Sequence, residues 1–254
     1  MSGFDQESAQ YDAHFTLTCV GRAQREQVYS ALVKDALFSG QKVLEINCGT
    51  GVDALEFHQR DNLIRATDLS EKMVQVARTR NPAGYFEVLD ARNLSAIREQ
   101  YSLVFSNFGG VNCFSPDEFS RFFEEAHAVI QDGGHLVLVV MGKRCSWDSF
   151  YFFLKGKWSK MGRRNTSNAL EVPVGKEFVK TWYYSPKQVR QLAAAHFDVL
   201  HLKPIGLFVP PSFLAPFFER HRLLFGALKK MDAFCRFSFL SNFSDHYYLS
   251  LRKK

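Results

Sequence analysis

Up to Met141, short apolar runs alternate with segments of helical periodicity. The helical segments include Arg25–Phe38 and Gly51–Gln59. Strands that alternate with helices usually pair in parallel and are covered on both faces. We therefore predict an α/β fold with a doubly wound, mostly parallel sheet. Its first five strands are expected at Lys42–Ile46, Asn62–Thr67, Tyr85–Leu89, Tyr101–Ser106 and Leu136–Val140.

Three serines mark the starts of helices in this pattern. Ser70 precedes an amphipathic segment that ends near Thr79. Ser115 opens the capping-box sequence SPDE, and Ser185 stands directly before a proline, which is favoured at the first helical position. The sequence DGG at Asp132 predicts a turn before the fifth strand.

The alternation stops after Met141. Residues 143–165 contain seven Lys or Arg and one acid, so their net charge of +6 equals that of the whole chain. A hairpin is expected over 170–184, strands over 199–205 and 245–252, and the last strand is expected at an antiparallel edge of the sheet. We predict a single domain, 1–254. Its core is expected at about 25–142 and 182–254, and cap inserts at about 143–181 and 210–242.

Composition narrows the class of protein. The five cysteines lie far apart without a C-x-x-C pair, which predicts neither a disulfide framework nor a metal site and favours the reducing cytoplasm. The first residues show no basic and apolar regions of a signal peptide. No apolar run approaches the roughly 18 residues of a membrane-spanning helix.

The net charge of +6 suits nucleic acid, an acidic small molecule or an anionic membrane surface. Segments 143–165 and 213–236 are candidates for peripheral membrane contact, because one is basic and the other carries a wide apolar stripe. A solvated face and a lid packed on the core are the alternatives. Nucleic acid is not favoured, and nothing in the sequence indicates an oligomeric state.

The stretch Val43–Asp53 carries the clearest chemical signal. A strand ends near an acid, Glu45, and a turn with Gly49 and Gly51 opens a helix, so backbone N–H groups can approach a ligand closely. The spacing also permits a dinucleotide site, with Asp68 as the later acid. Glu45 disfavours a pyrophosphate nearby and suits a cationic ligand instead.

Two further acids follow strands. Asp68 ends the second strand and Asp90 the third, so both are expected at the carboxyl edge of the sheet, where open α/β folds bind ligands. One suits the two hydroxyls of a ribose, and the other suits an adenine amine. An N-cap role is the alternative for Asp90.

Through these residues the chain resembles the class I, Rossmann-like S-adenosylmethionine-dependent methyltransferases, in particular their small-molecule group. The resemblance covers about residues 40–141 well and residues 8–40 and 182–205 more loosely. It implies a seven-stranded sheet and S-adenosyl-L-methionine as cofactor. Asn47 departs from the family, which usually has glycine there, but Asn tolerates a left-handed backbone.

The resemblance implies a set of cofactor contacts. The loop would hold the methionine part, Asp68 the ribose and Asp90 the adenine edge. The N-terminal segment would close over the cofactor, although it could equally be free, and Cys48 could equally be a packing residue. The implied residues are Tyr11, Phe15, Arg22, Glu45, Asn47, Cys48, Gly49, Gly51, Asp68, Leu69, Met73, Asp90, Ala91, Asn107 and Phe108.

Catalytic residues are less clearly indicated. His14, Asn107 and Tyr184 are candidates, and His135 and His246 qualify as bases by residue type alone. The fourth strand runs into Asn107-Phe108-Gly109-Gly110, without the Pro-Pro-aromatic element common in enzymes that methylate base or amide nitrogens.

Many aromatic residues lie in the two inserts, which suits a small lipophilic or aromatic acceptor. We therefore expect O- or C-methylation by in-line methyl transfer. An RNA or protein methyltransferase, an NAD-binding oxidoreductase and a non-catalytic cofactor-binding protein are the alternatives.

Overall fold

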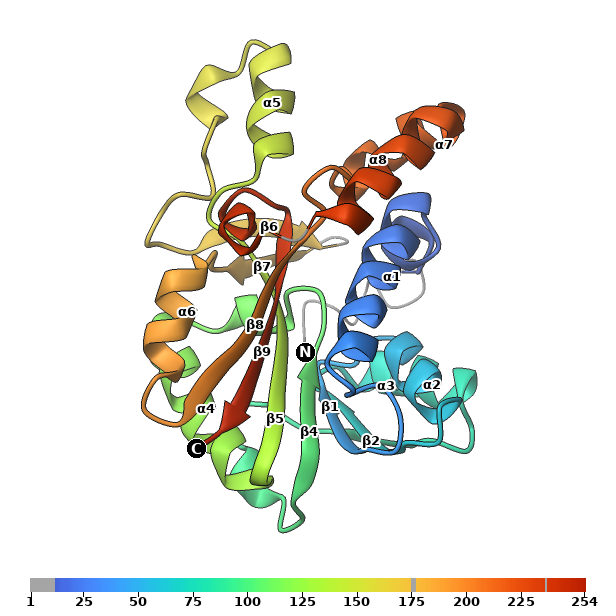
Figure 1. Ribbon diagram of the computed structural model, residues 1–254, viewed down its shortest axis with the longest axis vertical. Coiled ribbons are helices and arrows are strands. Elements are labelled where there is room, and N and C mark those ends of the chain that lie inside the picture. Colours follow the sequence, from blue (N-terminus) through green and yellow to red (C-terminus); the bar gives the residue numbers. More distant parts are fainter. Residues whose placement is uncertain (1–11, 175–176, 236) are drawn as a thin grey trace.

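A twisted sheet forms the centre of the molecule in the computed structural model, which describes residues 12–174, 177–235 and 237–254 (Figure 1). Its strands lie in the order β3-β2-β1-β4-β5-β9-β8, and a separate hairpin pairs β6 with β7. The strands are β1 Lys42–Ile46, β2 Leu63–Asp68, β3 Tyr85–Val88, β4 Tyr101–Ser106, β5 Ile130–Met141, β6 Leu170–Val174, β7 Glu177–Thr181, β8 Phe197–Ile205 and β9 His246–Lys253.

Helices cover both faces of the sheet (Figure 1). Phenylalanines of α4 and apolar residues of α6 form one core with one face, while α1 and α2 pack on the other. This confirms the predicted doubly wound α/β fold. The α-helices are α1 Cys19–Lys34, α2 Val52–His58, α3 Glu71–Arg80, α4 Pro116–Val129, α5 Ser146–Leu154, α6 Pro186–Ala193, α7 Ala215–Arg220 and α8 Arg222–Phe234.

The predicted helix starts have the expected hydrogen bonds. The Ser70 side chain accepts from the backbone N–H of Met73 at the start of α3. Ser115 and Ser185 each form a complete capping box with the residue three positions on, and each is followed by proline. Local sequence therefore fixes where these three helices begin.

The last strand does not lie where the sequence suggested. β9 is inserted between β5 and β8 and pairs antiparallel with both, so β8 forms the edge. The expected turn at Asp132 is also absent as a separate element: β5 begins at Ile130, and a register shift opposite Tyr101 and Leu103 accommodates the glycines. Both differences arise from pairing between strands that are distant in sequence.

Two inserts project beyond the carboxyl ends of the parallel strands (Figure 1). One carries α5 and the short helix η4, Trp158–Lys160; the other carries α7, α8 and the short helix η6, Ser238–Asn242. They touch each other, since the ring centroids of Trp147 and Phe218 lie 5.8 Å apart and those of Tyr151 and Phe213 lie 5.0 Å apart. We refer to α5, η4, α7, α8 and η6 together as the cap.

Within the described ranges, the chain forms no helix of the length and apolarity needed to cross a membrane.

Candidate active site

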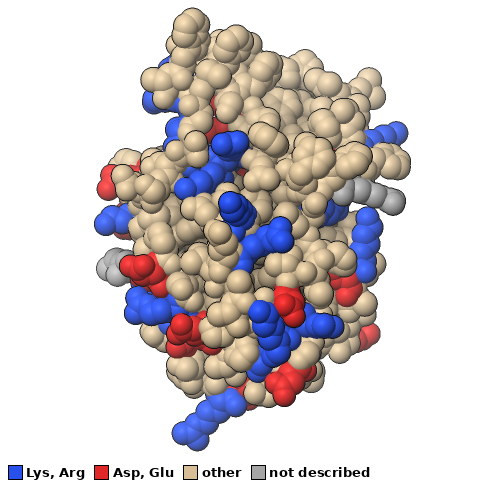
Figure 2. Space-filling view, turned by 60° about the vertical axis from the view of Figure 1, so that its left-hand side comes forward, with Lys and Arg blue, Asp and Glu red and all other residues tan. Residues whose placement is uncertain are grey.

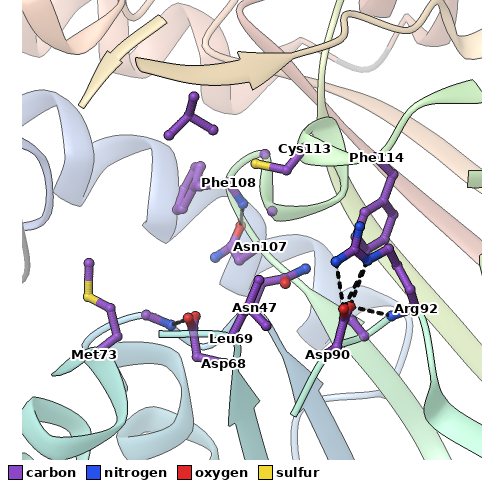
Figure 3. A pocket seen from close by; sticks show the side chains of 15 residues that line it. Asn47, Asp68, Leu69, Met73, Asp90, Arg92, Asn107, Phe108, Cys113 and Phe114 are labelled. Atoms are coloured by element: carbon purple, nitrogen blue, oxygen red, sulfur yellow. Dashed lines mark hydrogen bonds and ion pairs between the residues drawn. The ribbon is translucent and has the colours of Figure 1, made fainter. Parts of the chain in front are cut away.

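A cavity of about 280 Å³ opens at the carboxyl ends of β1, β2 and β4 (Figure 3). The hairpin β6–β7 lies above it and contributes Val179 to its wall. Of the residues predicted from the sequence, nine line this cavity. They are Asn47, Gly49, Asp68, Leu69, Met73, Asp90, Ala91, Asn107 and Phe108.

The loop after β1 has the left-handed backbone that the sequence suggested. Asn47, Gly49 and Gly51 have φ angles of 55°, 53° and 74°. A Cβ at Gly49 would meet no heavy atom within 4 Å, so this side of the loop faces open space in the cavity. A Cβ at Gly51 would lie 2.7 Å from the Cβ of Ala77. Gly49 therefore leaves room for a ligand, whereas Gly51 allows the loop and α3 to pack closely.

Asp68 ties this loop to the next strand. Its Oδ2 accepts from the Gly49 N–H at 2.9 Å, and its Oδ1 accepts from the Ser70 N–H at 2.8 Å. These bonds hold the carboxylate at the wall of the cavity, beside Leu69 and Met73 (Figure 3). The position suits acceptance of hydroxyl donors from a ligand in the cavity.

Asp90 lies on the opposite wall and is paired with Arg92 (Figure 3). The Arg92 guanidinium donates to both carboxylate oxygens, and it also donates to Glu118 of α4 at 2.7 Å. Burial opposes ionisation of Asp90, but the hydrogen bonds from Arg92 outweigh it and hold the pKa of Asp90 below its usual value. The pairing with Arg92 was not foreseen, although only one residue separates the two.

Glu45 does not line the cavity. It lies on the same face of β1 as Val43, because alternate residues of a strand share a face, and it is 1% exposed. Among the described residues its Oε2 has no hydrogen-bond partner. Burial and the Asp53 carboxylate raise the pKa of Glu45 well above its usual value, and Arg25 offsets part of this rise.

A buried polar network connects the surroundings of Glu45, between α1 and the sheet, to the cavity. Arg25 of α1 donates from Nε to Asp53 Oδ1 at 2.9 Å, and the Tyr29 hydroxyl donates to the same oxygen at 2.6 Å. Asp53 Oδ2 accepts from Asn107 Nδ2 at 3.1 Å. The network thus fixes the orientation of Asn107 at the end of β4. Asp53 lies two residues after Gly51, in the first turn of α2, and this position is the sequence signal that could have identified it.

Phe108 is held in an uncommon backbone conformation, with φ of 42°. Its N–H donates to the Asn107 Oδ1 at 3.0 Å. Its ring packs edge-on against Phe15 and His246, with centroids 5.0 and 5.4 Å apart, and the Arg25 guanidinium lies 5.1 Å from its centre. Backbone strain that the surrounding structure maintains in this way is common at functional sites.

The N-terminal segment reaches the loop by a contact that the sequence did not suggest. Asp12 accepts from the Thr50 hydroxyl at 2.8 Å and pairs with Arg80 of α3. Phe15 packs on Phe108 but does not itself line the cavity. Arg22 is exposed on α1 and does not line the cavity, so its contact with the cofactor stays a prediction. Arg25, three residues on, is buried against Asp53 and Phe108.

Other expected site residues lie elsewhere. Cys48 is buried in a small apolar cluster with Ala54, Val74 and Ala77, and burial raises the pKa of its thiol, which agrees with the alternative role of a packing residue. Tyr11 lies outside the described residues.

The catalytic candidates lie in different surroundings. Asn107 lines the cavity. The buried Tyr184 hydroxyl donates to the Phe114 carbonyl at 2.5 Å and is committed to the core. The side chain of His14 lies outside the described residues. His246 is buried with its ring against Phe108, and its Nδ1 lies 3.3 Å from Asp245 Oδ2.

Several lining residues were not expected from the sequence. Arg92 follows β3, and the others belong to the segment after β4 and to the hairpin. Asn112 joins these last two parts: its Nδ2 donates to the Trp182 carbonyl at 2.5 Å, and its Oδ1 accepts from the Met141 N–H. The additional lining residues are Arg92, Gly109, Gly110, Cys113, Phe114 and Val179.

These residues fit S-adenosylmethionine. Gly49 provides an open approach to the loop backbone, the acids at Asp68 and Asp90 match hydroxyl and amine donors, and Met73, Leu69 and Phe108 give apolar walls. A doubly wound seven-stranded sheet with one antiparallel strand and such a cavity defines the class I, Rossmann-like methyltransferase fold.

Comparison with known proteins agrees. Residues 43–134 match a family model described as a methyltransferase domain. The matched residues include the glycine loop and most of the cavity lining, and the fold and cavity agree with S-adenosylmethionine as the cofactor.

Individual relatives are more distant. The chain is 28% identical over 138 residues to a demethylmenaquinone methyltransferase of Clavibacter sepedonicus, covering 53% of this chain and 55% of that protein. It is 26% identical over 136 residues to a malonyl-[acyl-carrier protein] O-methyltransferase of Salmonella typhimurium, covering 52% and 49%. The chain thus spans about half the length of the curated relatives it matches.

A solved structure shows the same fold. The magnesium protoporphyrin IX methyltransferase of Synechocystis, with bound S-adenosylhomocysteine, matches with a TM-score of 0.58 and 15% identity, over 92% of this chain and 85% of that one.

Proposed function

We propose that this chain transfers the methyl group of S-adenosylmethionine to an oxygen or carbon of a small lipophilic or aromatic acceptor. The observation that carries the proposal is the cavity in which the open face of Gly49, the Asp68 carboxylate and the Phe108 ring meet. The relatives named above act on a quinone precursor and a carrier-bound malonyl group, and the solved structure on a porphyrin; these names support a small-molecule acceptor.

In this proposal the glycine loop and Asp68 bind the cofactor. When bound, S-adenosylmethionine supplies an electrophilic methyl group on a sulfonium, and displacement by the acceptor leaves a neutral thioether. Such a displacement depends on alignment and exclusion of water more than on acid–base catalysis. The hydrogen bond from Asn107 to Asp53 and the strained backbone at Phe108 hold the wall on which the acceptor would be aligned.

The acceptor side of the cavity is mainly apolar. Phe114, Cys113 and Val179 line it, and Val179 comes from the hairpin above the cavity. The residues after β4 lack the paired prolines that would grip a planar nitrogen. These features support an oxygen or carbon nucleophile over a base or amide nitrogen.

Binding and turnover provide the test. Thermal shift should show stabilisation by S-adenosylhomocysteine and none by NAD. Incubation with S-adenosylmethionine labelled in the methyl group and with pools of phenols, quinols and fatty acids should give a labelled product with the native chain and none with Asp68→Ala. Stabilisation by NAD alone would instead support the oxidoreductase alternative. Cofactor binding without label in any acceptor pool would support the binding-protein alternative.

A further inference from the structure

Large apolar side chains are exposed on the cap to an extent that the rest of the described surface does not show. Fifteen of the 22 most exposed large apolar residues belong to the cap, its connecting segments or the hairpin β6–β7. Trp158 is 71% exposed, Phe234 79% and Leu223 94%. Exposed apolar surface gathered at one end of a molecule normally marks a site of association.

The same surface is basic. Every residue from Phe153 to Arg163 is exposed, and this stretch contains Lys155, Lys157 and Lys160 among its aromatic and apolar residues but no acid. The Lys155 ammonium lies 5.9 Å from the centre of the Tyr151 ring, so it remains close to the apolar surface. Figure 2 shows an end of the molecule nearly free of charged residues, with lysines and arginines gathered below it.

The acids of the cap are used internally. Asp148 is buried and pairs with Arg163 and Arg164. Asp232 is buried at the end of α8, where it accepts from the backbone N–H groups of Leu207, Phe208 and Val209. Among the described residues of the cap helices, this leaves Glu219 as the exposed acid. The outward charge of the cap is therefore positive, while its anchors to the body are buried.

These anchors also hold the exposed groups in a fixed arrangement. Arg164, itself 6% exposed, donates to Asp245 at 2.9 Å and so fixes the end of the first insert. Asp232 fixes the second insert in the same way. The apolar side chains thus project from an anchored support at the end of the molecule that also holds the cavity (Figure 1).

We propose that the cap docks on the surface of an anionic lipid bilayer, with the apolar side chains of α5, η4 and α8 in the interface and Lys155, Lys157 and Lys160 at the lipid headgroups. Aromatic and leucine side chains interleaved with lysine favour a membrane interface. Protein–protein interfaces, in contrast, are depleted of lysine. The docking is peripheral and independent of the proposed methyl transfer.

Co-sedimentation of the full chain with vesicles tests the proposal. The chain should sediment with vesicles that contain phosphatidylglycerol and remain in solution with phosphatidylcholine alone. The variant Lys155→Glu/Lys157→Glu/Lys160→Glu should bind about 100-fold more weakly, since each of the three lysines contributes about fivefold near an anionic surface. Phe153→Ser/Trp158→Ser should also lose binding while its charge is unchanged.

A matched control separates the cap from a general charge effect. Arg98→Glu/Arg121→Glu/Lys187→Glu makes the same change of charge at exposed positions on the body, and it should sediment like the native chain. An equal loss in this control would overturn the assignment to the cap. Failure of the native chain to sediment with anionic vesicles would overturn the proposal outright. Self-association that Phe153→Ser/Trp158→Ser abolishes, without vesicle binding, would assign the surface to a second copy.

Tryptophan fluorescence gives a second measurement. Trp158 is exposed, while Trp147 and Trp182 are partly buried. Anionic vesicles should shift the emission to shorter wavelength, and Trp158→Phe should abolish the shift while sedimentation persists. An undiminished shift in that variant would place the contact elsewhere. Binding of S-adenosylhomocysteine without vesicles should be the same in all variants, so it reports on the proposed function separately.

Discussion

The cavity edge of the sheet and the cap lie at the same end of the molecule, but their polar groups are arranged differently. At the edge, Asp53 and Asp68 are joined to neighbouring elements by short hydrogen bonds. On the cap, lysines and aromatic side chains extend into solvent, and the buried acids serve only to hold the support. This difference implies that substitutions at the edge change ligand affinity or stability, whereas substitutions on the cap change what the molecule contacts.

The largest effect is expected at Asp68. Asp68→Ala leaves the Gly49 and Ser70 N–H groups without their carboxylate acceptor and removes a group that faces the cavity. Affinity for S-adenosylhomocysteine, measured by calorimetry, should fall by about 100-fold or more, because hydrogen bonds to charged groups contribute about 1.5–3 kcal/mol each. Phe150→Ala on the cap should retain native affinity. Equal affinities for all three proteins would remove the distinction between the two regions.

Substitution of the two loop glycines should affect stability and cofactor affinity to different extents. Gly51→Ala places a methyl group against Ala77 and should lower the free energy of unfolding by about 2–3 kcal/mol. Gly49→Ala meets no protein atom, so its effect on stability should be smaller, about 1 kcal/mol. Gly49→Ala should lower the affinity for the cofactor more than it lowers the free energy of unfolding. Denaturant unfolding and calorimetry on both variants test this, and a larger loss of stability in Gly49→Ala would contradict it.

Glu45 makes stability depend on pH. Its folded pKa lies well above the usual 4.5, so between these two values the folded state binds more protons than the unfolded state. Stability therefore falls as pH rises through this window. Glu45→Gln cannot ionise and should gain about 1–2 kcal/mol over the native chain at pH 8 but not at pH 4. Unfolding measured at both pH values provides the check; a constant difference would show that ionisation is not the cause.

The smallest effect on stability is expected on the cap. Phe153→Ser/Trp158→Ser changes two exposed side chains and should alter the free energy of unfolding by about 0.5 kcal/mol or less. Thermal unfolding in the absence of vesicles measures this. A large loss would mean that these residues contribute to packing, and it would weaken the contrast between cap and edge.

The parts that local sequence specifies were predicted well. Ser70, Ser115 and Ser185 each cap a helix with groups three residues away, so their role can be read without the fold. Asn47 takes the left-handed conformation that its residue type permits. The approach of Asp68 to the glycine loop also follows, because the carboxyl ends of neighbouring parallel strands meet at one edge.

The parts that depend on distant contacts were not predicted. β9 lies between β5 and β8, and no local sequence pattern indicates with which strands it pairs. Arg25 rather than Arg22 lies on the buried face of α1, where it contacts Asp53 of α2 and Phe108 after β4. Glu45 turns away from the cavity because its strand face belongs to the α1–α2 layer, where Asp53 and Arg25 lie. Val179 reaches the cavity only through the hairpin that Asn112 joins to the sheet.

The central place of β9 has a consequence for how the protein is made. The ribosome synthesises β9 after every other strand, yet both its neighbours need it to complete their backbone hydrogen bonds. Until then β5 and β8 each present an unpaired edge to the surrounding cell. The seven-stranded sheet therefore cannot close until β9 has been synthesised, and chaperones would be most useful to the chain during that interval.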